Sequence, residues 1–274
     1  MTVSFSADPV CFEPVDFPAP WPSRPWIYAN VITSRNGIVT WVRAGAHDDP
    51  VREIAGGDFR RPGRRADVRL MRRLRAGADA VSFGAQTLRD QPNLIGRVDD
   101  VGGELGASLL RFRAEQGRSL IPLQVIYSES GQLDLAVPIF NTSGLTPIVV
   151  TTTAGERRLR SGSRDDRRVS VLIAGEESID SSGLIRAHER LFEELGVRYV
   201  DCEGGAVILE ALHEADILDE IFVTVTDVDI DPGSHAGIKR IAALDGGKAR
   251  LIAESRTNSD AGYRFQRWRF HDRS

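Results

Sequence analysis

The chain has 274 residues, of which 41% are hydrophobic, and its 35 basic and 39 acidic side chains give a net charge of −4. This hydrophobic fraction is enough for an ordinary globular core. The acidic balance argues against a protein whose main role is to bind nucleic acid or an anionic membrane. We therefore expect neither of these partners.

The two cysteines, Cys11 and Cys202, lie far apart and form no metal-binding or redox motif. We interpret them as reduced thiols of a cytoplasmic protein and expect no metal site. The chain shows neither the basic start and apolar run of a signal peptide nor the roughly 20 apolar residues of a membrane span. These features predict a soluble protein.

The first 25 residues are rich in proline and include "PVCFEPVDFPAPWPSRP". Such a composition favours an extended segment on the surface, where it is able to reach a partner subunit. We assign residues 1–25 to this segment and residues 26–274 to a single domain.

Apolar runs of strand length then recur along the chain. Several are apolar at consecutive positions, which is typical of strands covered on both faces. The predicted strands are 26–33, 79–84, 123–128, 147–153, 169–175, 198–203 and 220–225.

Helical patterns at 66–78, 183–196 and 205–215 alternate with these strands. Such alternation predicts an α/β fold with a mostly parallel sheet. The segments 249–255 and 263–270 instead form a hairpin-like pair, so we expect the sheet to end in antiparallel strands.

The stretch "YVDCEGGAVILE" places Glu203, Gly204 and Gly205 between a strand and a helix. Glycines at this position allow a pyrophosphate to approach the backbone and the helix N-terminus. A plain tight turn explains the same residues equally well. The motif alone leaves both interpretations open.

Two other strand ends carry polar residues. "VSFGAQTLRDQPNLIGR" continues from Gly84 through a short polar segment to Asp90 and Arg97, and "VVTTT" leads into a polar loop, "AGERR". Each is more simply a solvated loop when taken alone. Because strand ends in one sheet converge on one edge, together they favour a shared cleft.

The segment 60–77 is rich in arginine. Its spacing predicts an amphipathic helix with Val68, Leu70, Met71 and Leu74 toward the core and arginines outward, although one or two arginines would suit a substrate phosphate. Histidines such as His188 and His213 fall in predicted helices, and we interpret them as surface or partly packed residues.

The order of "NVITSRNG", "LRAGADAVSFGAQTLRDQPNL", "VVTTT" and "LGVRYVDCEGGAVILEALHEADILDEIFV" resembles the reductase domain of riboflavin biosynthesis. This domain is the C-terminal half of the bifunctional deaminase-reductase, and the resemblance covers residues 24–226. It implies a dihydrofolate-reductase-like three-layer α/β/α fold and commonly a homodimer. It also implies NADPH-dependent reduction of a phosphorylated heterocycle such as 5-amino-6-(5-phosphoribosylamino)uracil.

The resemblance also implies site residues, with Glu203 and Asp90 as candidates to orient the substrate or relay a proton. Thr151 and Thr152, in the "TTT" stretch, are expected to contact the cofactor through their hydroxyls. The full set of expected cofactor contacts is Thr33, Gly84, Thr87, Asp90, Thr151, Thr152, Gly204, Gly205, Ala206 and Val207. The expected substrate contacts are Asn36, Arg69, Leu94, Arg97 and Glu203. We further predict that Arg157 and Arg158 favour NADPH over NADH by binding its 2′-phosphate.

The chain departs from the family pattern at Asn36, where an aspartate is usual, and at Asn30, where a lysine is usual. The motifs of a zinc deaminase do not occur in it. Two alternatives are a dihydrofolate-reductase-like or other small-heterocycle reductase, and a non-catalytic nucleotide-binding protein. Turnover of the cofactor separates an enzyme from a binding protein.

Overall fold

A nine-stranded sheet forms the centre of the computed structural model, in the order β12-β13-β10-β3-β9-β5-β6-β7-β8. The structure describes residues 2–3, 15–45, 49–99, 102–161, 169–244, 247, 249–257 and 259–271. Cys11 and the first part of the proline-rich stretch, residues 9–14, lie outside these residues.

Seven neighbouring strands of this sheet are parallel. They are β3 (Trp26–Thr33), β5 (Ala80–Gly84), β6 (Leu123–Tyr127), β7 (Ile148–Thr151), β8 (Ser170–Ile173), β9 (Tyr199–Cys202) and β10 (Glu220–Val225). The hairpin of β12 (Arg250–Thr257) and β13 (Asp260–Arg269) extends the sheet antiparallel to β10. The predicted mostly parallel sheet with a C-terminal antiparallel hairpin is confirmed.

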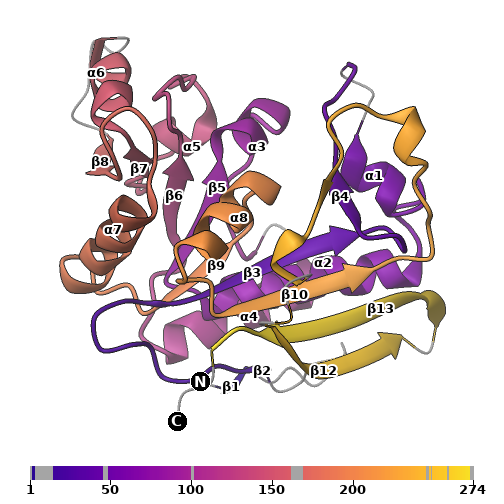
Figure 1. Cartoon of the computed structure of the whole chain (residues 1–274). Coiled ribbons are helices and arrows are strands. Elements are labelled where there is room, and N and C mark those ends of the chain that lie inside the picture. Colours follow the sequence, from indigo (N-terminus) through magenta and orange to yellow (C-terminus); the bar gives the residue numbers. More distant parts are fainter. Residues whose placement is uncertain are drawn as a thin grey trace.

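Helices cover both faces of the sheet, which gives the predicted three-layer α/β/α fold (Figure 1). One face carries α7 (Ser181–Glu193) and α8 (Ala206–Glu214), and the other carries α2 (Pro62–Gly77), against which α4 (Gly103–Glu115) packs. Alternate side chains of β3 belong to different cores, one on each side of the sheet, because successive side chains of a strand point to opposite faces. Ile27 lies in the core under α7 and α8, and Tyr28 lies in the core under α2.

Two segments predicted as loops are helices, so these predictions were wrong. Residues after Gly84 form α3 (Ala85–Asp90), and "AGERR" lies in α6 (Thr153–Ser161). The Thr152 hydroxyl accepts a hydrogen bond from the Gly155 amide and thereby caps α6. An ion pair between Glu156 and Arg160, four residues apart, supports the same helix. The sequence also gave no expectation for α4 or the short α5 (Pro138–Asn141).

The arginine-rich helix α2 forms as predicted, with Leu70 and Leu74 in the core. The expectation that its arginines point outward was wrong at Arg73 and Arg75, which are 5% and 2% exposed. Long arginine side chains enter a protein interior when their guanidinium groups find acceptors. For Arg75, the acceptor lies in the candidate site.

A small lobe stands beyond the carboxyl ends of β3 and β10, on the right of Figure 1. It contains β4 (Ile38–Thr40), α1 (Pro50–Ile54), η2 (Pro232–Ser234) and β11 (Lys239–Arg240), whereas the following η3 (Ala242–Leu244) packs against α8 in the main core. Ile38, Trp41, Ile54 and Ile230 form a separate apolar cluster in it. The lobe therefore has a small apolar core separate from those of the sheet, and it lies beside the carboxyl edge of the sheet.

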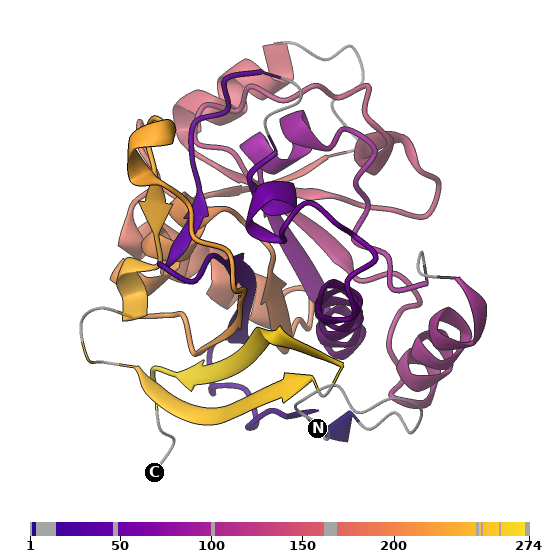
Figure 2. The same ribbon diagram turned by 90° about the vertical axis from the view of Figure 1, so that its right-hand side faces the viewer.

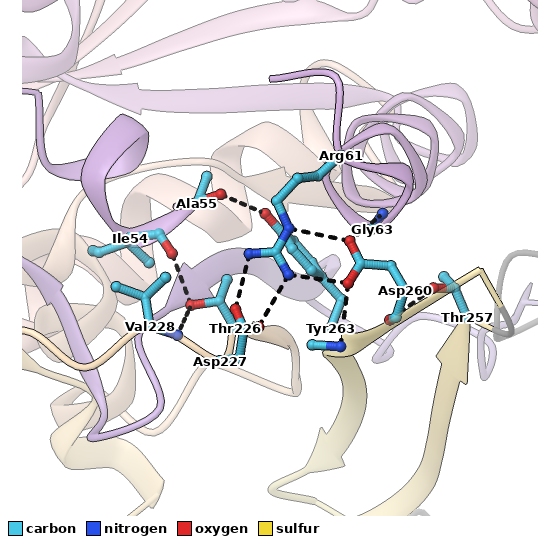
Figure 3. A network of polar contacts seen from close by, with 11 residues as sticks. Ile54, Ala55, Arg61, Gly63, Thr226, Asp227, Val228, Thr257, Asp260 and Tyr263 are labelled. Atoms are coloured by element: carbon cyan, nitrogen blue, oxygen red, sulfur yellow. Dashed lines mark hydrogen bonds and ion pairs between the residues drawn. The ribbon is translucent and has the colours of Figure 1, made fainter. Parts of the chain in front are cut away.

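Arg61, just before α2, connects the segment after β10 to the C-terminal hairpin (Figure 3). Its guanidinium donates to Asp227 after β10 and to Asp260 at the start of β13. Beside it, Tyr263 donates to the carbonyl of Ala55 at 2.9 Å. A Cβ added to Gly63 would lie 2.2 Å from the Tyr263 ring, so the close approach of α2 requires glycine there.

The N-terminal segment packs on the body of the same chain (Figure 2). The short strands β1 (Thr2–Val3) and β2 (Val15–Asp16) pair with each other, and the ring of Phe17 stacks on Tyr28 at 4.3 Å. Trp21 and Arg24 both donate to the buried carboxylate of Asp219. The described part of residues 1–25 is thus anchored to the sheet.

Candidate active site

The carboxyl ends of β3, β9 and β5 lie side by side and place the glycine turn next to the start of α3 (Figure 1). The amide of Glu203 donates to the carbonyl of Ser82, which continues the ladder between β9 and β5 by one residue. Gly204 and Gly205 then lead into α8. This is the edge of an α/β sheet where ligands bind.

Arg75 of α2 binds both carboxylate oxygens of Glu203 through its Nε and Nη2 atoms. The two side chains are 3% and 10% exposed, and Arg75 Nη1 also donates to the carbonyl of Arg97 at 3.2 Å. A bidentate guanidinium–carboxylate pair fixes the orientation of both groups. Glu203 therefore enters the site as an oriented, charge-paired carboxylate.

The two glycines of the turn have different surroundings. A Cβ at Gly204 would lie 3.0 Å from Ile208, whereas a Cβ at Gly205 would meet nothing within 4 Å. Gly205 is the N-cap of α8 with φ −67°, a conformation open to any residue, and Val207 in the first turn is 63% exposed. The first amides of a helix have no acceptor within it. This open N-terminus fits a phosphate group.

Helix α3 forms the neighbouring part of the edge, with Gly84 at its N-cap and Thr87 close to Gly84. Asp90 at its end accepts from Gln86 at 3.0 Å and pairs with Arg43 at 3.2 Å. Arg43 belongs to the segment after β4, so this ion pair joins the small lobe to α3. Sequence reasoning did not identify Arg43.

Thr33 and Asn36 hold the turn between β3 and β4. The Thr33 hydroxyl donates to the carbonyl of Ile38 at 3.1 Å. The Asn36 side chain donates to the carbonyl of Ile230 at 2.7 Å and accepts from the Ser34 hydroxyl. In this structure both side chains connect the lobe to the sheet edge.

Thr151 and Thr152 use their hydroxyls inside the protein. Thr151 donates to the carbonyl of Ser128 at 2.5 Å, and Thr152 donates to the carbonyl of Glu129 at 3.0 Å. Both side chains are buried. Arg157 and Arg158 of α6 are exposed at the end of β7, two strands beyond β5 in the sheet.

The predicted substrate residues are spread around α2 and the segment after α3. Leu94 packs at the border of the core, and Arg97 forms an ion pair with Asp99 at 2.7 Å. Arg69 lies about 120° around the helix from Arg75, since each residue turns an α-helix by about 100°. Arg75, on another side of the same helix, is the arginine that reaches Glu203. Sequence reasoning did not identify Arg75, although it lies in "LRAGADAV", the stretch in which α2 ends and β5 begins.

Asp67 is a further acid on α2 that sequence reasoning missed. Burial raises its pKa, and its ion pair with Arg64 acts in the opposite direction. Within the described ranges, no three His, Cys, Asp or Glu side chains gather as a metal site. None of the helices described is long and apolar enough to cross a bilayer.

Comparison with known proteins identifies the family. Residues 25–228 match the model of the RibD C-terminal domain. A 2,5-diamino-6-ribosylamino-4(3H)-pyrimidinone 5′-phosphate reductase of Archaeoglobus fulgidus is 28% identical over 200 residues, which cover 72% of this chain and 78% of that protein. The chain belongs to the RibD C-terminal domain family. The predicted family, a reductase family of riboflavin biosynthesis, is thereby confirmed, as is the prediction of an oxidoreductase.

Solved structures agree with this fold. A pyrimidine reductase-like protein of Corynebacterium diphtheriae matches with a TM-score of 0.64 and 23% identity over 89% of this chain and 91% of its own. The Saccharomyces cerevisiae riboflavin biosynthesis reductase matches with a TM-score of 0.55 and 15% identity over 90% of both chains. For RibD of Acinetobacter baumannii the TM-score is 0.62 at 17% identity, and the match covers 90% of this chain and 58% of the longer RibD.

Proposed function

We propose that this protein reduces a ribosylamino-pyrimidine 5′-phosphate with NADPH, converting the ribosyl group to a ribityl chain. The observation that carries the proposal is the open N-terminus of α8 at Gly205, immediately after the paired Glu203. The open helix N-terminus and the oriented carboxylate adjoin at one sheet edge, an arrangement that supports hydride transfer between two bound molecules.

For the cofactor, the backbone from Gly204 to Val207 would hold the pyrophosphate, with Gly84 and Thr87 beside it. Apart from the chain neighbours of Gly205, no heavy atom of the described residues lies within 4 Å of a Cβ built there, which supports this fit. When bound, NADPH supplies the hydride. Strands lie about 4.8 Å apart, so β7 is roughly 14 Å from β9, a span that an extended dinucleotide bridges.

For the substrate, we propose that Arg75 fixes Glu203 toward the pyrimidine and that Arg97, 39% exposed at its side chain, lies on the phosphate side. The Archaeoglobus relative is named for the 2,5-diamino-pyrimidinone. The uracil compound predicted above differs from it by an oxo group at ring position 2. A homodimer in the cytoplasm belongs to the same proposal.

The first experiment is a titration of the purified protein with NADPH and with NADH, followed by energy transfer from its four tryptophans to the reduced nicotinamide. We expect NADPH to bind at micromolar concentrations and NADH more weakly. Gly205→Val should abolish binding without unfolding the chain, because its side chain enters the space that the pyrophosphate would fill. Parental affinity of this variant would refute the site.

Ser181→Val is the matched control, since Ser181 is the exposed first residue of α7, another helix of the same layer. It should bind NADPH like the parent. Turnover is then measured with the diamino-pyrimidinone, the uracil compound and dihydrofolate. Reduction of dihydrofolate alone would favour the alternative reductase, and binding without any turnover would favour a nucleotide-binding protein.

A further inference from the structure

The carboxyl group of Asp201 is enclosed beneath α2. Its side chain is 0% exposed, and neither oxygen has a hydrogen-bond partner among the described residues. Asp201 lies opposite Tyr28 of β3 and Val81 of β5 in the sheet register. It therefore shares the face of Tyr28, whose hydroxyl donates to the carbonyl of Leu74 in α2 at 2.8 Å. A buried carboxyl without a partner calls for an explanation beyond packing.

The ionisable groups around Asp201 include the phenol of Tyr28, the thiol of Cys202, the carboxylate of Glu203 and the guanidinium of Arg75. Glu203 follows two residues later on the same face of the strand, toward the pocket. Because Glu203 and Arg75 form a neutral pair, Asp201 is the unmatched acid of this group. Burial and the charge of Glu203 raise its pKa well above the usual range, while Arg75 acts in the opposite direction. Enclosure without a hydrogen-bond partner favours the protonated, neutral carboxyl in the resting protein.

A second buried oxygen near Glu203, on Asn30, also bears on the kind of ligand that would bind here. The Oδ1 atom of Asn30 is also buried without a hydrogen-bond partner among the described residues. Ala29 pairs with Cys202, so Asn30 follows in β3 beside the position of Glu203. Unmatched oxygen acceptors on neighbouring strands favour a group that brings N–H donors or positive charge.

We propose that Asp201 is a charge-balancing residue, which lets the pocket accept a positively charged ribosylamine nitrogen by giving up its own proton. The inference rests on the proposed function. It makes Asp201 a positioning residue that acts through Glu203, since its own carboxyl is enclosed.

The proposed step conserves atoms and charge. The C1′–O4′ bond of the ribosyl ring breaks, and the lone pair of the exocyclic nitrogen forms a C1′=N bond, so that this nitrogen becomes cationic. O4′ takes a proton from solvent, and Asp201 releases its own proton, which leaves Asp201 as an anion that balances the cationic nitrogen. A bound reduced nicotinamide would supply the hydride that C1′ accepts, which makes the nitrogen neutral. Asp201 finally takes one proton from solvent, so each turnover consumes one NADPH and one proton.

The test compares two ligands by calorimetry at pH 7, in two buffers of different ionisation enthalpy. One ligand is 1-amino-1-deoxyribitol 5-phosphate, which has an ammonium group on C1, and the other is ribitol 5-phosphate, which is uncharged there. We expect the parent to bind the amine about tenfold more tightly and to release about one more proton with it than with ribitol phosphate. Binding is measured without turnover, so the result does not depend on catalysis.

Asp201→Asn should lose the preference for the amine and the additional proton release, while its affinity for ribitol phosphate stays within about twofold of the parent. Asp201→Leu should show the same two losses, so the test does not depend on the correct folding of Asp201→Asn alone. Asp216→Asn is the control for the same chemical change, because the Asp216 side chain is 75% exposed. It should keep both parental properties.

Preference for the amine that persists in both Asp201 variants would overturn the inference, as would equal binding of the two ligands by the parent. If the parent bound neither ligand while still binding NADPH, the proposed substrate site itself would fail, and the role of Asp201 would fail with it. The first two results leave the proposed function intact. The two failures are therefore distinguishable.

Discussion

Tyr127 of β6 and His188 of α7 form a buried hydrogen bond of 2.9 Å between the phenol oxygen and Nε2. The other ring nitrogen, Nδ1, lies 2.8 Å from the carbonyl of Leu184. Because a carbonyl only accepts, Nδ1 carries the proton of the neutral ring, and Tyr127 donates to Nε2. The predicted surface or partly packed histidine is instead fully buried. Its environment holds the ring in one tautomer.

This pair predicts a loss of stability in acid. Burial lowers the pKa of His188 from 6.5 to about 4. The unfolded chain therefore binds the proton first as the pH falls. The contribution to stability is fully present above pH 6.5 and is lost between pH 6.5 and 4, by about 3 kcal/mol in total.

Urea unfolding of the parent and of His188→Gln at pH 7, 5.5 and 4.5 measures this contribution. The variant should be less stable at pH 7, and the difference should shrink toward pH 4.5. Tyr127→Phe is the control, because it removes the hydrogen bond but keeps the titrating ring. A difference that stays constant over this range for His188→Gln would contradict the prediction.

The pair of Arg75 and Glu203 predicts a combined loss of stability and activity. Arg75→Met leaves the nearly buried carboxylate of Glu203 without its cation, which should cost about 3–5 kcal/mol of unfolding free energy. It should also lower kcat/KM, since Glu203 loses its orientation. Arg65→Met, on an exposed position of the same helix, should change the unfolding free energy by less than about 0.5 kcal/mol. Parental stability of Arg75→Met would count against this assignment.

The junction around Arg61 predicts a second pH effect (Figure 3). Burial alone would raise the pKa of Asp260, but hydrogen bonds from Arg61 and from the amides of Gly63 and Gly262 make the net shift downward. The stability that it contributes is therefore present at neutral pH and lost as the pH falls through its folded pKa. Asp260→Asn should be destabilised at pH 7, with a smaller difference from the parent near pH 3.

Asp227→Asn provides the comparison, because Asp227 pairs with the same arginine but is 49% exposed. Solvent screens this ion pair, so we expect a smaller loss of stability at pH 7. Thermal unfolding of the two variants over the pH range shows whether the loss follows burial. Equal losses would indicate that Arg61 itself, and not its buried partner, determines the effect.

The preference for NADPH over NADH provides a test of α6. Replacing Arg157 and Arg158 with alanine should reduce NADPH affinity about tenfold or more and leave NADH affinity unchanged, since these guanidinium groups are expected to bind the 2′-phosphate. Arg160→Ala on the same helix should keep the preference, because Arg160 is engaged by Glu156. The titration described for the parent measures all three proteins. Equal affinity of the parent for both nucleotides would refute the prediction.

Much of the fold was predictable because its signals are local. The strand 26–33 is the observed β3 (Trp26–Thr33), and 220–225 is the observed β10 (Glu220–Val225). Continuous apolar runs fit strands buried on both faces, and glycine marks the turn after β9. Helix α6 was missed because its polar sequence also suits a loop. Its cap at Thr152 and its ion pair become visible once the chain is folded.

The sequence by itself determined the alternation of strands and helices, the glycine turn at a strand end and the order of blocks that indicates the reductase family. The tertiary structure decided which arginine of α2 reaches Glu203, which acid of Asp90, Asp201 and Glu203 has no partner, and that Arg43 comes from a separate lobe. The physical reason is that local propensity depends on neighbours along the chain, whereas charge pairing and burial depend on groups far apart in sequence. Arg75 and Glu203 are 128 residues apart and meet because a parallel sheet brings the ends of its strands to one edge.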